Sequence, residues 1–171
     1  YYGENGGVVF PNPNAPTGVE LPLSDVEDIL LHNQDVIVIV DEAYVDFGGT
    51  SAMSLIDKYE NLLVVQTFSK SRSMAGMRIG FACGSPKLIK YLNDAKYSFN
   101  SYTMNRITIE AGVAAIKDKE YFRNMCDKIV ATREWTKKEL AALGFTFPDS
   151  KTNFIFASHR SCPARELFEV M

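Results

Sequence analysis

A basic, hydroxyl-rich stretch between two apolar runs, Thr67–Gly80, has the residue types of a reactive phosphate-binding loop. Hydroxyls, guanidinium groups and the permissive backbone of Gly76 suit a phosphate. A lysine such as Lys70, held beside other cations, loses its proton more readily, and the neutral amine can form a Schiff base with a carbonyl. The alternative is a solvated basic loop. The hydroxyls belong to Thr67, Ser69, Ser71 and Ser73, and the guanidinium groups to Arg72 and Arg78.

Two other segments place chemically useful side chains directly after apolar runs. Three prolines stiffen the loop from Pro11 to Gly18, which could hold the Asn14 side chain still. The segment that begins with Asp41 and contains Tyr44 follows a β-branched run. Each has a simpler interpretation: a connecting loop for the first, and a helix N-cap with a half-buried aromatic residue for the second.

The elements around these segments predict one α/β sheet. Strands are expected at Val8–Phe10, Val36–Val40 and Leu62–Gln66, the second of them buried on both faces. A helix from Leu23, with Ser24 as its N-cap, would cross between the first two in a βαβ unit. Ligands bind at the carboxyl ends of such strands, where the candidate side chains should meet.

The rest of the chain predicts one more strand of this sheet and a helical second half. Too few residues separate Lys70 from Ile79 for a helical crossover, so Ile79–Ala82 is expected to run antiparallel to its predecessor. Helices are expected from Ser85-Pro86 to about Lys96, over 105–116, over 119–143 with Gly144 beyond its end, and from Cys162, with short strands at 145–147 and 153–156.

Composition excludes several classes of function. The formal charge of −3 gives no overall attraction to nucleic acid or to an anionic membrane. Three dispersed cysteines favour neither a disulfide framework nor a zinc site. With no apolar run of transmembrane length and no signal sequence at the start, we expect a cytoplasmic protein. The cysteine spacing predicts no metal site.

Three motifs together resemble a known family. Asn14-Ala15-Pro16-Thr17-Gly18, Asp41-Glu42-Ala43-Tyr44, and Ser69-Lys70 followed eight positions later by Arg78 are similar to the ordered signature of fold-type I pyridoxal 5′-phosphate aminotransferases. Within this superfamily the chain most resembles the histidinol-phosphate aminotransferases. The likeness covers essentially the whole chain but only the middle of the family's length, which indicates a fragment.

The resemblance implies a role for each matching residue. Lys70 would carry the cofactor and move the substrate proton, and Asp41 would pair with the pyridinium nitrogen. Tyr44 and Asn14 would bind the phenolic oxygen of the ring, and Thr67, Ser69 and Arg78 the phosphate. Many relatives have Asn where this chain has Ala15, so the role of Asn14 assumes a one-residue accommodation in the loop.

The resemblance also implies a fold and a reaction. The fold would be the three-layer α/β major domain with a mixed, mostly parallel sheet, partly present in residues 1–100, followed by inter-domain helices and the start of a smaller α+β domain in 101–171. The reaction would be transamination between glutamate and imidazole-acetol phosphate in histidine biosynthesis, by a homodimer. The alternatives are another amino acid aminotransferase, a threonine-phosphate decarboxylase, or an inactive fragment that binds the cofactor weakly.

Overall fold

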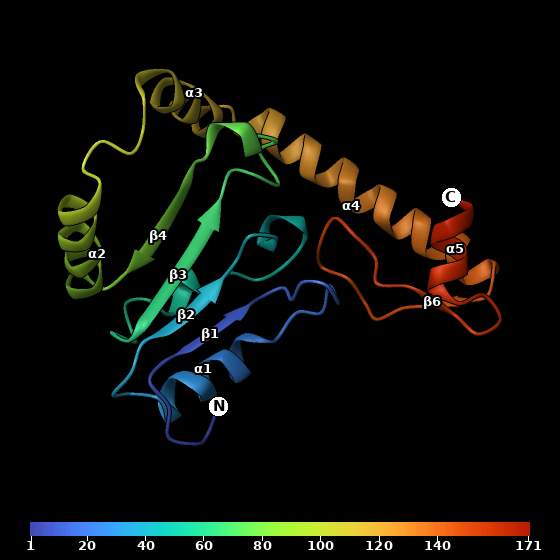
Figure 1. The fold of residues 1–171 in the computed structure, drawn as a ribbon, viewed down its shortest axis with the longest axis horizontal. Helices are drawn as coiled ribbons and strands as arrows, with labels where there is room; N and C mark the ends of the chain where they lie inside the picture. Colours follow the sequence, from blue (N-terminus) through green and yellow to red (C-terminus); the bar gives the residue numbers. More distant parts are fainter.

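Four strands form the central sheet of the computed structural model, which describes residues 1–171. Figure 1 shows these strands side by side in chain order, with β1, β2 and β3 parallel and β4 antiparallel to β3. The predicted α/β fold, with a mixed and mostly parallel sheet and an antiparallel fourth strand, is confirmed. The strands are β1 (Val8–Pro11), β2 (Val38–Asp41), β3 (Leu62–Thr67) and β4 (Gly80–Gly84).

Helices make up most of the remaining chain. None of them is long and apolar enough to cross a membrane. They are the α-helices α1 (Leu23–His32), α2 (Pro86–Phe99), α3 (Arg106–Lys117), α4 (Lys119–Ala142) and α5 (Ala164–Val170), and the short 3-10 helices η1 (Val45–Phe47), η2 (Ala52–Leu55) and η3 (Ala75–Met77).

The hydrophobic core lies between one face of the sheet and the layer formed by α1 and η2. Alternate strand residues point to this face, as the two-residue period of a strand requires. The opposite face is less covered than the sequence predicted, because Val9 is 68% exposed and Ile39 only partly buried. The ten core residues are Val8, Phe10, Val26, Ile29, Leu30, Val38, Val40, Ala52, Leu62 and Val64.

The N-cap predicted at Ser85 is confirmed, and Asn105 is a further N-cap that was not predicted. The Ser85 hydroxyl accepts from the backbone N–H of Leu88 at the start of α2, and Asn105 caps α3 in the same way. The predicted cap of α1 is wrong. Pro22 occupies the N-cap position without a side-chain hydrogen bond, and Ser24 instead donates to the neighbouring Asp25 carboxylate.

The second half of the chain leads away from the central sheet. In Figure 1, α4 runs from the side of α3 to the region of β6 and α5. There β5 (Phe145–Thr146) pairs antiparallel with β6 (Ser158–His159). The strand predicted at 153–156 is wrong, because serine and threonine side chains, rather than a neighbouring strand, bond the backbone of this segment.

A buried carboxylate joins β2 to the neighbouring elements. Glu42 follows β2 and is only 2% exposed. Its Oε1 accepts from the backbone N–H of Ala52 at 2.6 Å, and its Oε2 accepts from Ser51 Oγ at 2.6 Å and Gln66 Nε2 at 2.8 Å. Burial raises the pKa of the Glu42 carboxyl, although these hydrogen bonds act in the opposite direction. The end of β2 is thereby fixed to β3 and to η2.

Gly18 must lack a side chain. Its φ is +77°, and an added Cβ would lie 2.5 Å from Ser150 Oγ and 3.2 Å from Ser150 Cα. We expect Gly18→Ala to lower the free energy of unfolding by about 2–4 kcal/mol, from backbone strain and overpacking. Gly6→Ala, where a Cβ would meet open space, should change it by less than about 0.5 kcal/mol. Urea unfolding measures both, and equal effects would contradict this account.

The raised pKa of Glu42 predicts a pH dependence of stability. Between the ordinary pKa of 4.5 and the raised folded value, the native state binds more protons than the unfolded state, so the free energy of unfolding falls as pH rises. We expect Glu42→Gln to reduce this fall in urea unfolding at pH values just above 4.5. Glu139→Gln, at an exposed position of α4, should keep the wild-type slope.

Candidate active site

The carboxyl ends of three parallel strands bring the predicted residues to one edge of the sheet. Pro11 of β1 pairs with Asp41 of β2, and Asp41 pairs with Val65 of β3. The loops that follow these strands carry Asn14, Tyr44 and the residues around Lys70, and Arg78 precedes β4, whose first residue pairs with Thr67.

Lys70 and Tyr44 lie close together although they follow different strands. The Lys70 ammonium nitrogen is 5.3 Å from the centroid of the Tyr44 ring, within cation–π distance. The ring of Phe154 packs edge-on against Tyr44, with centroids 5.1 Å apart and an interplanar angle of 85°. Lys70 is exposed and Tyr44 is half-buried and held by Phe154. The Lys70 amine is therefore accessible to a ligand that also contacts the Tyr44 phenol.

Asp41 lies on the sheet face opposite the core. Alternation along β2 puts Val40 in the core and Asp41 on the other face, and the parallel register gives Val65 and then Thr67 the same side. The Asp41 Oδ1 accepts a hydrogen bond from the backbone N–H of Ala43 at 3.0 Å. The carboxylate is half-buried and fixed in direction, and its second oxygen has no protein partner.

Two hydroxyls form a small polar cluster where β3 ends. Thr67 Oγ1 is 2.9 Å from Ser69 Oγ and accepts from the backbone N–H of Ser69 at 3.1 Å. Arg78, with a left-handed φ of 56°, follows η3 and is exposed. Its Nη1 donates to the carbonyl of Ala75, at 2.8 Å, within the same turn. The structure therefore brings the hydroxyls together but does not bond Arg78 to them.

Asn14 uses its side-chain oxygen inside its own loop. The Asn14 Oδ1 accepts from Thr17 Oγ1 at 2.7 Å and from the backbone N–H of Thr17 at 3.3 Å. These two hydrogen bonds hold the loop before Gly18. The amide Nδ2 of Asn14 makes no hydrogen bond within the protein.

Two residues of the predicted phosphate loop have structural roles instead. Arg72 Nη1 donates to the carbonyl of Ala115 at 2.9 Å, and the guanidinium carbon lies 3.9 Å from the centroid of the Phe122 ring. The buried Ser71 hydroxyl donates to Asp46 Oδ2 at 2.5 Å. The expectation that Arg72 and Ser71 contact a phosphate is therefore wrong, because both anchor the Lys70 loop to the protein.

Sequence reasoning missed several residues that support the site. Asp46, in the Tyr44 segment, accepts from Ser71 of the Lys70 loop, and Phe154 packs on Tyr44 from 110 residues away. No local pattern reveals such contacts. Glu42 could have been found, because strand alternation after Val40 puts the residue at 42 on the core side. Arg133 lies on the apolar stripe of α4, and a charged residue in such a stripe is usually buried and paired.

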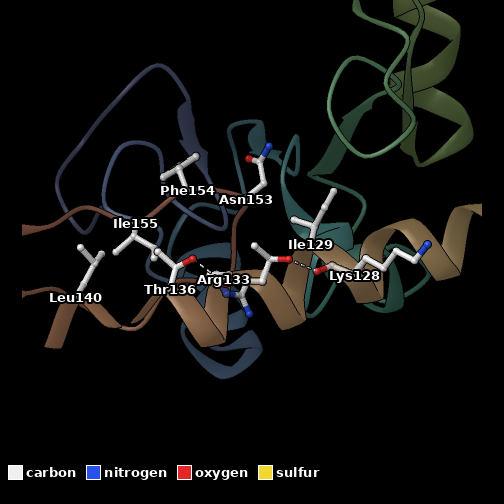
Figure 2. A pocket seen from close by; sticks show the side chains of 9 residues that line it. Lys128, Ile129, Arg133, Thr136, Leu140, Asn153, Phe154 and Ile155 are labelled. Atoms are coloured by element: carbon white, nitrogen blue, oxygen red, sulfur yellow. Dashed lines mark hydrogen bonds between the residues drawn. The ribbon is translucent and has the colours of Figure 1, made fainter. Parts of the chain in front are cut away.

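A cavity of about 490 Å³ lies away from the predicted residues. Figure 2 shows it between α4 and the segment of Asn153, Phe154 and Ile155. None of the seven candidate cofactor residues lines it, so cavity size does not locate the predicted chemistry. Phe154 borders both this cavity and the Tyr44 ring, so the cavity adjoins the candidate site through one side chain.

Comparison with known proteins gives the same family across the chain. The family model described as "Aminotransferase class I and II" matches residues 2–171. A histidinol-phosphate aminotransferase of Lactococcus lactis subsp. cremoris (strain SK11) is 52% identical over 171 residues, which are all of this chain and 48% of that protein. The chain thus spans about half the length of that relative.

Solved structures agree with this comparison. The histidinol-phosphate aminotransferase of Clostridium acetobutylicum shares the fold with a TM-score of 0.87, at 23% identity, over 96% of this chain and 51% of that one. The histidinol-phosphate aminotransferase of Sinorhizobium meliloti was solved in complex with pyridoxal-5′-phosphate. It gives a TM-score of 0.81 at 25% identity, over 92% of this chain and 43% of that one. The chain belongs to the class I and II aminotransferase family.

Proposed function

We propose that this chain is the central part of a pyridoxal 5′-phosphate-dependent aminotransferase, with Lys70 as the residue that carries the cofactor. The observation that supports this most strongly is the position of the Lys70 amine, 5.3 Å from the centroid of the Tyr44 ring. Asp41 leaves the adjacent strand at the same edge of the sheet. Membership of the class I and II aminotransferases agrees with this assignment.

The donors at this edge fit the chemical groups of pyridoxal phosphate. The Lys70 amine suits the aldehyde, the Asp41 carboxylate suits a protonated ring nitrogen, and the Tyr44 phenol suits the phenolic oxygen, with the Asn14 amide as a second donor. Thr67 and Ser69 offer hydroxyls to the phosphate. Arg78 uses one of its five N–H groups on Ala75, so other donors remain for the same anion.

Each of these side chains has a defined task. When bound, the cofactor supplies an electron sink for the charge that develops at the substrate Cα. Lys70 holds and moves the proton at that carbon. Asp41 keeps a proton on the ring nitrogen by its negative charge, and its hydrogen bond from Ala43 fixes the direction of that charge. Tyr44 donates to the phenolic oxygen and orients the ring.

We propose that the amino group is exchanged between glutamate and imidazole-acetol phosphate, in histidine biosynthesis. The support is the set of histidinol-phosphate aminotransferases that are 52–56% identical to this chain. We assign residues 1–100 to the large cofactor-binding domain, and residues 101–171 to the inter-domain helices and the start of the smaller domain.

We also propose that the protein is a homodimer. Several large apolar side chains between the end of α2 and the start of α3 are exposed, including Phe99 and Tyr102 at 94% each. Clusters of exposed apolar residues mark interaction surfaces. A second copy of the protein would cover them.

Substitution of Lys70 tests the central assignment. In the full-length protein that contains this chain, the wild type should show a visible absorbance band with pyridoxal phosphate, and borohydride should attach the cofactor to Lys70. Lys70→Ala should abolish both the attachment and transamination. Lys138→Ala, at an exposed position of α4, serves as the control. Retention of the band and of full activity in Lys70→Ala would refute the role of Lys70.

Asp41→Asn tests the negative charge of Asp41 separately from attachment of the cofactor. An amide cannot stabilise a protonated ring nitrogen, so kcat should fall about 10²–10³-fold, the size typical for loss of an electrostatic stabiliser. Borohydride should still attach the cofactor to Lys70. The exposed Asp57→Asn should keep the wild-type rate. Steady-state kinetics with both substrates would decide, and an unchanged kcat in Asp41→Asn would exclude the proposed partner of the ring nitrogen.

A further inference from the structure

A buried arginine in α4 links two segments that reach the candidate site. The Arg133 side chain is 5% exposed. Its Nη1 donates to the backbone carbonyls of Phe47 and Thr152, both at 2.8 Å, and its Nε donates to Glu134 at 2.9 Å. Phe47 lies 86 residues from Arg133 in the chain, so this contact joins α4 to η1, which follows β2.

Both carbonyls belong to segments that hold Tyr44. Phe47 is the last residue of η1, and Tyr44 is its N-cap residue. Thr152 precedes Phe154 by two residues, and the Phe154 ring packs edge-on against Tyr44. Figure 2 shows Arg133 beside the segment of Asn153 and Phe154. The guanidinium thus fixes the backbone next to Tyr44 and the backbone of its aromatic neighbour.

The segment from Ser150 to Phe154 is itself rigid. Ser150 and Thr152 are fully buried, and both hydroxyls contact the Phe154 carbonyl, at 2.7 and 3.1 Å. The backbone N–H of Lys151 donates to the carbonyl of Gly18, at the end of the Asn14 loop. A change at Arg133 therefore acts on Phe154 through a segment that has little freedom of its own.

The guanidinium shape is required for this link. Arginine offers five N–H donors in a planar fork, and here the fork reaches two carbonyls and a carboxylate. Lysine has a single charged nitrogen on a flexible stem and cannot reproduce these directions. Burial of a charge is unfavourable unless the charge is paired and hydrogen-bonded, so loss of any of these three contacts would destabilise the buried guanidinium.

We propose that Arg133 is a positioning residue for Tyr44, which it holds through Phe47 on one side and through Thr152 and Phe154 on the other. The inference rests on the proposed function, in which Tyr44 donates to the phenolic oxygen of the cofactor. It adds that the strength of this contact is set by a residue of α4 that touches neither cofactor nor substrate.

A double-mutant cycle in the full-length protein tests this proposal. The dissociation constant of pyridoxal phosphate is measured by absorbance titration for the wild type, Arg133→Lys, Tyr44→Phe and the double variant. Arg133→Lys should raise it about five- to tenfold, the equivalent of one weakened hydrogen bond. In the Tyr44→Phe background, where the phenol is gone, the same change should raise it less than about twofold.

Controls separate positioning from a general loss of structure. Arg123→Lys, on the exposed side of the same helix, should leave the constant unchanged. Phe154→Leu removes the aromatic neighbour of Tyr44 and leaves Arg133 in place. It should raise the dissociation constant of pyridoxal phosphate in the wild-type background, and should raise it much less in the Tyr44→Phe background. An equal effect of Arg133→Lys in both backgrounds, or no effect in either, would overturn the proposal.

Hydrogen exchange of the cofactor-free protein gives a second readout. Arg133→Lys should speed exchange of the amides of Phe47 and Gly49, which bond within the Tyr44 segment, and leave β1 to β3 protected. If the wild type does not bind pyridoxal phosphate, the proposed function fails, and this measurement alone decides whether Arg133 holds the segment. Unchanged exchange would refute it. Binding by the wild type without the predicted coupling refutes only the role of Arg133.

Discussion

The in-register parallel pairing of β1, β2 and β3 is the constraint on which the candidate site depends. Pro11, Asp41 and Val65 lie side by side, so three loops leave the sheet at one edge. A shift of one residue in β2 would move Asp41 to the core face, where a carboxylate could not meet a ligand. The apolar residues Val38 and Val40 prevent this shift, because it would expose them. Packing of the core therefore determines which face of the sheet carries the Asp41 side chain.

Buried polar groups then fix the loops that the sheet has gathered. Glu42 ties the end of β2 to β3 and η2, the hydroxyl of Ser71 ties the Lys70 loop to Asp46, and Arg133 joins η1 to the segment around Thr152. No buried side-chain nitrogen or oxygen atom is without a hydrogen-bond partner. Because these groups lie where the dielectric constant is low, loss of one partner leaves the other without a hydrogen bond and lowers the stability of the protein. The site is thus held by a few long-range polar contacts above a conventional apolar core.

Much of the fold could be predicted from sequence, because local patterns determine it. Apolar runs predicted all four strands of the central sheet, and the short spacing before Ile79 predicted the antiparallel β4. The errors came where nonlocal contacts dominate. The residues 153–156 look like a strand, but the hydroxyls of Ser150 and Thr152 bond the backbone that a neighbouring strand would have used. Ser24 looks like a cap, yet α1 begins at Leu23 and its N-cap residue is Pro22.

The common location of the candidate residues could be predicted from the sequence, but the residues that support them could not. Motif order brought Asp41, Tyr44 and Lys70 together, and the structure places all three at one edge of the sheet. Arg72 was misassigned because composition cannot tell a guanidinium that awaits an anion from one that stacks on Phe122. The contacts of Phe154 and Asp46 could not be predicted from local sequence, since their partners are 110 and 25 positions away. Roles that depend on distant neighbours appear only in the folded molecule.

The Lys70 loop and the Tyr44 loop are both attached to α4, which has a mechanical consequence. The Lys70 loop is attached near the start of this helix, through Arg72 and Phe122, and the Tyr44 loop is attached further along, through Arg133. These two points are separated by about 16 Å of continuous helix at 1.5 Å per residue. A continuous helix transmits displacement with little internal deformation, so a tilt of α4 would act on both loops at the same time.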